Sequence, residues 1–121
     1  MEGLYPMFLL NDYGEKIMVI VEFNIIPLGV GISVSKFLAP ALKELKKRKV
    51  KYEITSMCTI FEARNMDEAL NIVRAAHEAI FEADVKRAVT TIRIDDRRDK
   101  EGSMEEKVKS LKTRLEEKKT C

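Results

Sequence analysis

Reactive side chains are scarce in this chain, which has one histidine, His77, and two cysteines, Cys58 and Cys121. Two cysteines cannot form the disulfide framework of a small secreted protein, and their spacing matches no metal motif, so we expect no metal site. His77 falls on the apolar stripe of a predicted helix, where a packed histidine is more common than a catalytic base. No Ser-His-Asp or Cys-His arrangement can be assigned. The sequence therefore predicts a protein that is not an enzyme.

Excess charge and long apolar runs are also missing. The 22 basic residues are balanced by 20 acidic ones, giving a net charge of +2, which is too small to favour binding to nucleic acid. No apolar run reaches the roughly 20 residues that a membrane span requires, and no basic leader precedes a cleavage site. With 121 residues, 45% hydrophobic and 35% charged, the chain is typical of one globular domain. We expect a cytoplasmic protein with no membrane association.

Residues 1–16 differ from the rest of the chain because they show no sustained hydrophobic period. Two interpretations are open: an N-terminal extension, or a short ordered arm that covers an apolar patch. From residue 17 to residue 121 we expect a single domain. Strands are predicted at 17–26 and 85–94. The stretches 51–57 and 58–63 are predicted as two strands or one bent ribbon.

Helices are predicted after each of three capping signals. Ser33 begins one helix, Asn65 with Glu68 begins a second, and Ser103 with Glu106 begins a third. The resulting order, β-α-β-β-α-β-α, contains the split βαβ pattern of ferredoxin-like domains. The predicted fold class is therefore α+β, with a four-stranded antiparallel sheet, two helices on one face and an additional C-terminal helix.

Apolar residues are expected on the sheet face that the two helices leave uncovered. The candidates are Ile20, Ile54 or Met57, and Ile60 or Phe61. The last helix also carries a narrow apolar seam, formed by Met104, Val108, Leu111 and Leu115. The sheet face predicts burial against another copy of the chain, and the seam predicts docking either on one edge of the domain or against another chain. We therefore expect a homo-oligomer.

The Gly29-x-Gly31-x-Ser33 segment lies between a strand and a helix, a position that can bind phosphate through backbone N–H groups. It lacks the lysine of a P-loop and the third glycine of a dinucleotide site. We favour a flexible turn followed by a helix cap. A phosphate-ester hydrolase that uses this turn is the least favoured hypothesis.

Polar residues interrupt strands that are otherwise apolar. They are Glu22, Asn24, Thr55, Thr59, Glu62, Thr90, Thr91 and Arg93. Two interpretations are open: pairing between strands or subunits, for example Glu22 or Glu62 with Arg93, and a small polar pocket that holds a heterocycle. The five charged residues that follow, 95–99, are consistent with a solvated turn or with ion pairs.

Several segments together resemble the small archaeal and bacterial thiamine-binding protein family. They are Pro27-Leu28-Gly29 with Ser33-Val34-Ser35-Lys36-Phe37, Lys51 to Met57 with Thr59 and Glu62, Ala76-His77-Glu78-Ala79, and Thr90 to Asp99. The resemblance implies a ferredoxin-like subunit that forms dimers and tetramers through sheets and the last helix. It also implies binding of thiamine or its hydroxymethylpyrimidine half, with no established reaction. Cys58 and the Ala83-Asp84 pair depart from the family pattern.

The resemblance and the polar strand residues together suggest a set of ligand-binding positions. They are Glu22, Asn24, Ser33, Ser35, Phe37, Thr55, Thr59, Glu62 and Thr91. A carboxylate or hydroxyl is expected to face the aminopyrimidine, and a carboxylate or an aromatic ring such as Phe37 to face the thiazolium cation. We predict a non-enzymatic carrier or sensor in a homotetramer built from dimers, with thiamine as ligand and no cofactor. The alternative is a regulatory module that binds another small metabolite and a protein partner.

Overall fold

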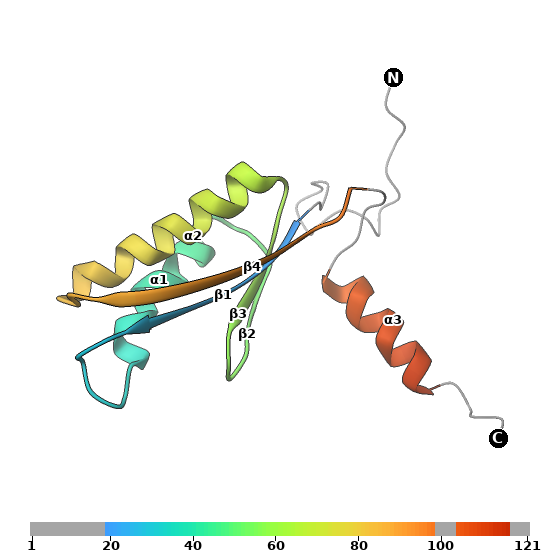
Figure 1. The fold of residues 1–121 in the computed structure, drawn as a ribbon. Helices are drawn as coiled ribbons and strands as arrows, with labels where there is room; N and C mark the ends of the chain where they lie inside the picture. The colour runs from blue at the N-terminus through green and yellow to red at the C-terminus, as the bar shows by residue number, and fades with distance from the viewer. Residues whose placement is uncertain (1–18, 99–103, 117–121) are drawn as a thin grey trace.

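The computed structural model describes residues 19–98 and 104–116. Their order is β1 (Val19–Pro27), α1 (Ser35–Lys47), β2 (Tyr52–Ile54), β3 (Thr59–Ala63), α2 (Met66–Ile80), the 3₁₀ turn η2 (Phe81–Ala83), β4 (Ala88–Asp96) and α3 (Met104–Glu116). The four strands form an antiparallel sheet in the order β2-β3-β1-β4. Helices α1 and α2 lie on the same side of this sheet (Figure 1). The α+β, ferredoxin-like prediction is confirmed, whereas the interpretations of residues 1–16 and of the Ser103 cap lie outside the described residues.

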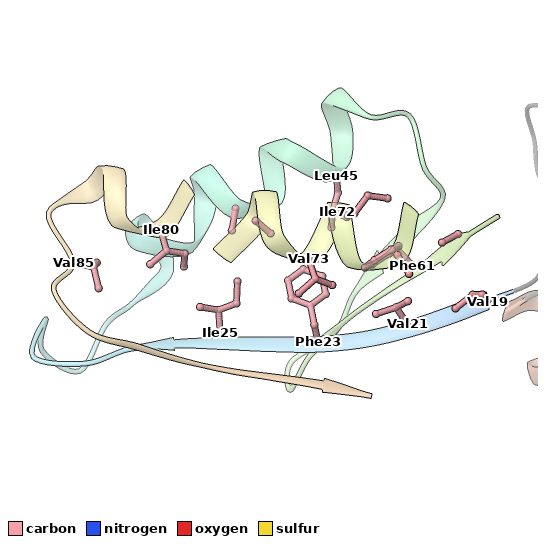
Figure 2. Packing of buried hydrophobic residues seen from close by; sticks show 14 residues of the cluster. Val19, Val21, Phe23, Ile25, Leu45, Phe61, Ile72, Val73, Ile80 and Val85 are labelled. Atoms are coloured by element: carbon pink, nitrogen blue, oxygen red, sulfur yellow. The ribbon is translucent and has the colours of Figure 1, made fainter. Parts of the chain in front are cut away.

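The core lies between this sheet and the two helices. Alternate residues of β1 point into it, namely Val19, Val21, Phe23 and Ile25, as period-two alternation requires. Figure 2 shows these side chains beneath residues of α2 and beside Phe61 of β3. The Phe23 and Phe61 rings meet edge to face, with centroids 5.8 Å apart. Phe61 is fully buried in this core, so its predicted place on the uncovered face is wrong.

The outer face of the sheet is the one that α1 and α2 leave uncovered. It carries Ile20 and Ile60, because both alternate with residues of the core. Ile54 instead pairs with Thr59 and shares the helical face at the edge of the sheet, so its predicted position is also wrong. Met57 is exposed in the β2–β3 hairpin and belongs to neither face.

The two helices begin differently from one another. At α2, the side chain of Asn65 accepts a hydrogen bond from the Glu68 N–H at 2.8 Å, which confirms the predicted cap. Glu68 in turn accepts from the Arg64 N–H at 2.8 Å. At α1, the capping position is Val34, with no side-chain hydrogen bond, so the predicted Ser33 cap is wrong. The helix then continues through Pro40 to Lys47.

The loop between β1 and α1 takes its shape from two glycines. Gly29 and Gly31 have φ values of +77° and +95°, a region that side-chain-bearing residues rarely adopt. These glycines therefore serve a turn, as the favoured interpretation of this segment predicted.

The first turn of helix α3 contacts the rest of the domain through a hydrogen bond and two ion pairs. The Met104 N–H donates to Oε2 of the buried Glu62 at 3.0 Å, on the outer side of β3. Ion pairs between Lys51 and Glu105, and between Asp95 and Lys107, lie on either side of this bond. Beyond its first turn, α3 extends away from the sheet (Figure 1). None of the helices in the described parts of the chain is long and apolar enough to span a bilayer.

Candidate functional site

A cavity of about 130 Å³ opens between β1, α1 and the β2–β3 hairpin. Its lining comes from three segments of the chain, residues 23–25, residues 38–42 and residues 54–59. The apolar part of the lining includes Leu38 and Leu42 of α1, and the polar part includes Asn24, Ser56 and Thr59. Small-molecule pockets commonly combine apolar walls with a few polar groups, and their volumes are usually about 300–1,000 Å³. The cavity is therefore large enough for one ring of a ligand rather than for a whole cofactor.

Thr55 gives the hairpin wall of this cavity its shape. Its hydroxyl oxygen accepts from the Met57 N–H at 3.2 Å and the Cys58 N–H at 3.0 Å, and its hydroxyl donates to the Cys58 carbonyl at 2.8 Å. A hydroxyl has one hydrogen to donate and two lone pairs. Since all three are used within the hairpin, Thr55 has no hydrogen bond left to offer a ligand.

Two other polar side chains on the lining are available for a ligand. Ser56 and Thr59 make no side-chain hydrogen bond within residues 19–98 and α3. Thr59 is 8% exposed and lies opposite Phe23, on the helical face of the sheet. Asn24 borders the cavity through the edge of its strand, because its side chain lies on the outer face opposite Thr91. Two hydroxyls supply both donors and acceptors, which suits a heterocycle that carries nitrogen and amino groups.

An ion pair lies at the rim of the cavity, on the outer face of the sheet. The Cys58 Sγ, which lines the cavity, is 3.6 Å from Oε2 of Glu22. The Arg93 guanidinium reaches both carboxylate oxygens of Glu22, at 3.2 and 3.3 Å. This bidentate pair confirms the predicted pairing of Glu22 with Arg93. Arg93 thus already neutralises the carboxylate that lies beside Cys58.

The nine predicted ligand residues are divided among several places. Asn24, Thr55 and Thr59 line the cavity, and Glu22 lies beside it. Thr91 faces Asn24 across the β1–β4 ladder on the outer face. Glu62 lies under the first turn of α3, where it caps that helix.

The remaining predicted ligand residues belong to the start of α1. Ser33 and Ser35 are exposed there, outside the cavity lining. The Phe37 ring is half-buried, and Lys36 Nζ lies 5.1 Å from its centroid, so a cation already occupies that face. Sequence reasoning missed Ser56, Leu38 and Leu42 as lining residues. The Ser56 position follows from the hairpin turn, but nothing in the sequence places α1 above it.

His77 is engaged in packing, as its apolar surroundings predicted. Its Nδ1 lies 2.6 Å from the Thr90 hydroxyl, and its ring meets the Phe81 ring edge to face. In residues 19–98 and 104–116, no group of three or more His, Cys, Asp or Glu residues is placed to hold a metal ion.

The charged run at the end of β4 forms an ion pair within itself. Arg98 Nη2 lies 2.8 Å from Oδ2 of Asp96. This hydrogen bond holds the pKa of the exposed Asp96 carboxyl below its ordinary value. Asp96 and Arg98 therefore pair within the run, whereas Asp95 pairs with Lys107 of α3.

Comparison with known proteins places this architecture in one family. A family model described as "Thiamine-binding protein" matches residues 21–112. A UPF0045 protein of Methanothermobacter thermautotrophicus is 43% identical over 99 residues, which cover 81% of this chain and 100% of that protein.

Solved structures agree with this assignment. A hypothetical protein of Methanocaldococcus jannaschii has a TM-score of 0.72 at 40% identity, covering 78% of this chain and 95% of the other. A structure from Thermotoga maritima is named as a proposed thiamine biosynthesis/salvage protein. Its TM-score is 0.65 at 22% identity, covering 77% of this chain and 97% of the other, so the two proteins share a fold. The chain therefore belongs to the thiamine-binding protein family.

Proposed function

We propose that this protein binds thiamine, or its hydroxymethylpyrimidine half, without chemical reaction and serves as a carrier or sensor. The observation that carries the proposal is the cavity between β1 and the β2–β3 hairpin, whose lining includes the hydroxyls of Ser56 and Thr59 with no hydrogen bond among the described residues. The volume of about 130 Å³ suits the flat pyrimidine ring, which would leave the thiazolium at the rim. Family membership supports the ligand class, and the cavity supports binding at this position.

A role without catalysis is supported by the engagement of the reactive groups. The His77 ring is bonded to Thr90, and the Cys58 thiol lies between Thr55 and Glu22. Within residues 19–98 and 104–116, His77 bonds to no carboxylate and Cys58 to no histidine, the pairings that activate a base or a thiol nucleophile. Ligand binding requires only the cavity, whereas turnover would also require an activated nucleophile or base.

The protein is further proposed to act as a homotetramer built from dimers. On the outer face, Ile26 and Val89 are paired and each 45% exposed at the Pro27 end of β1. The half-buried Ile20 and Ile60 lie toward the other end of the same face. Exposed apolar residues in one region of a surface favour burial against another protein. The seam of α3 has the same character, with Leu111 65% exposed and Leu115 82% exposed. Two apolar surfaces on one subunit are sufficient to build a tetramer from dimers.

Calorimetric titration tests the binding proposal. The protein is titrated with thiamine and, in parallel, with hydroxymethylpyrimidine, and a micromolar or tighter Kd is expected for both, about −8 kcal/mol. Thr59→Val keeps the side-chain shape but removes the hydroxyl on the cavity lining, and it should weaken both ligands about five- to tenfold. Thr113→Val on the exposed face of α3 is the matched control and should leave both constants unchanged.

The result that contradicts the proposal is the absence of heat and of any thermal shift with either ligand. The regulatory alternative, a module that responds to another metabolite and a protein partner, would then be the leading hypothesis.

Light scattering after size exclusion tests the assembly separately. Leu111→Glu is expected to reduce the tetramer to dimers, and Ile26→Glu is expected to disrupt the contact between sheets. A monomer for the unmodified protein at micromolar concentration would contradict the assembly.

A further inference from the structure

Strand β1 is longer than its neighbour β3, and this difference leaves part of its edge open. The β1–β3 ladder ends at the pair Phe23–Thr59, whereas the β1–β4 ladder continues to the pair Pro27–Ala88. From Asn24 onward, β1 therefore has a strand neighbour on one side only, within the described part of the chain. The chain that follows Ile54 turns away in the hairpin and returns only at Thr59.

The hydrogen-bonding pattern identifies which backbone groups face this open side. The Leu28 N–H donates to the Arg87 carbonyl at 2.8 Å, so the backbone groups of Leu28 point toward β4. Along a strand, successive residues present their N–H and C=O groups to opposite sides. Ile25 and Pro27 therefore point away from β4, to the side where β3 has ended. Pro27 has no N–H, so Ile25 supplies the donor there, together with its own carbonyl.

The cavity lies against this same edge. Phe23, Asn24 and Ile25 all line it, although their side chains alternate between the two faces of the sheet. Three consecutive residues of a strand can all border the same cavity only through the backbone at the strand's edge. The edge of β1 therefore forms one wall of the cavity. The opposite wall is the hairpin, whose hydrogen bonds close on Thr55 and Cys58. No hydrogen bond joins Ile25 to the hairpin among residues 19–98.

We propose that the backbone N–H and C=O of Ile25 bind the edge of an aminopyrimidine that lies in the cavity. The N–H donates to a ring nitrogen, and the C=O accepts from the adjacent exocyclic amino group. The ring thereby takes the place of the strand residue that would face Ile25 if β3 continued. This inference rests on the proposed thiamine binding and specifies it, because it names the half of the ligand that is recognised and the groups that recognise it.

Backbone recognition makes a definite statement about ligand chemistry. A 4-aminopyrimidine presents an acceptor next to a donor, complementary to the donor and acceptor of one residue in an open strand. Its 4-oxo analogue presents a donor at the ring nitrogen and an acceptor at the oxygen, so both bonds are lost and like groups face each other. Sites that hydrogen-bond a substrate discriminate strongly against an analogue that leaves their polar groups unpaired. We expect the 4-oxo analogue to bind about 30-fold more weakly or worse.

The test combines titration with amide NMR on the full-length protein. Saturating hydroxymethylpyrimidine should move the Ile25 amide proton downfield, while the Leu28 amide, already bonded to Arg87, should stay in place. Calorimetry compares the 4-amino and 4-oxo pyrimidines. Leu42→Phe adds volume to the cavity wall and should abolish both the Ile25 shift and the binding heat. Leu70→Phe, on the exposed face of α2, is the matched control and should change neither.

The possible failures can be told apart. If the aminopyrimidine binds while the Ile25 amide stays unchanged, or if the two analogues bind equally, recognition by Ile25 is overturned and the proposed function stands. If neither thiamine nor hydroxymethylpyrimidine binds, the proposed function is overturned, and this inference with it. A downfield Ile25 shift together with preference for the 4-amino compound supports the inference.

Discussion

Replacing Glu62 by alanine removes the bond that fastens α3 to the sheet. Glu62 is 2% exposed, and its Oε2 accepts the Met104 N–H at 3.0 Å, at the positive end of the helix. A hydrogen bond to a charged acceptor contributes about 1.5–3 kcal/mol. The two neighbouring ion pairs, Lys51–Glu105 and Asp95–Lys107, are partly exposed and contribute at most about 1 kcal/mol each. Glu62 is therefore the strongest polar attachment of this helix among the contacts described, beside the buried Met104 side chain.

The expected cost of Glu62→Ala is about 2–3 kcal/mol of docking free energy. Because a helix of 13 residues is marginal on its own, an undocked α3 should also unwind. The open population of α3 should rise about 30- to 150-fold. Hydrogen exchange measured by mass spectrometry on peptides covering Met104–Glu116 reports this rise directly.

Two further variants make the measurement decisive. Glu62→Gln keeps an oxygen acceptor but loses the charge, so its exchange should lie between those of the native protein and the alanine variant. Glu53→Ala, on the same outer face but exposed, should leave α3 unchanged. The reasoning is refuted if Glu62→Ala leaves the exchange of α3 at the native level while the rest of the domain stays folded.

Further predictions concern the core, the α2 cap, the rim and the β4 terminus. Phe61→Ala should cost about 3–5 kcal/mol in urea unfolding because Phe61 is fully buried, and a loss below 1 kcal/mol would contradict the packing. Asn65→Ala should cost about 1 kcal/mol, with Asn71→Ala on the exposed side of α2 as control. Arg93→Gln removes the cation that pairs with the Glu22 carboxylate. The variant should therefore bind cationic thiamine up to about fivefold more tightly, while its affinity for neutral hydroxymethylpyrimidine stays unchanged. Equal effects on both ligands would contradict this prediction. The pKa of Asp96 is lowered in the folded state because its carboxylate pairs with Arg98. The contribution of this pair to folding stability is therefore present above the ordinary carboxyl pKa, and it is lost as pH falls through the lowered value. Carboxyl NMR titration of Arg98→Ala should therefore show the pKa of Asp96 rising toward its ordinary value, and no change would contradict the pairing.

The order of elements could be predicted from sequence because hydrophobic periodicity and capping are local properties. The strand predicted at 17–26 corresponds to β1, and Asn65 with Glu68 located the start of α2. The apolar surroundings of His77 likewise predicted a packed residue rather than a base. Each of these features depends on neighbours within about one or two turns or strand pairs along the chain.

The site was predicted less completely, because polar residues on strands signal a need for partners without saying which partners. Glu22, Thr55 and Glu62 looked alike in the sequence. In the structure, Glu22 pairs with Arg93, Thr55 closes a hairpin, and Glu62 caps a helix that begins 42 residues later. Contacts over such separations are set by how the chain folds back, which no local pattern encodes.

What the sequence by itself determined is therefore the set of elements, their order and the family likeness. What only the tertiary structure decided is that β3 ends at Thr59 while β1 continues to Pro27, and that α1 and the hairpin enclose the edge left open. The length of a strand that is actually paired depends on its neighbour in space. For that reason the cavity, and the backbone groups of Ile25 that face it, emerge only once the sheet is assembled.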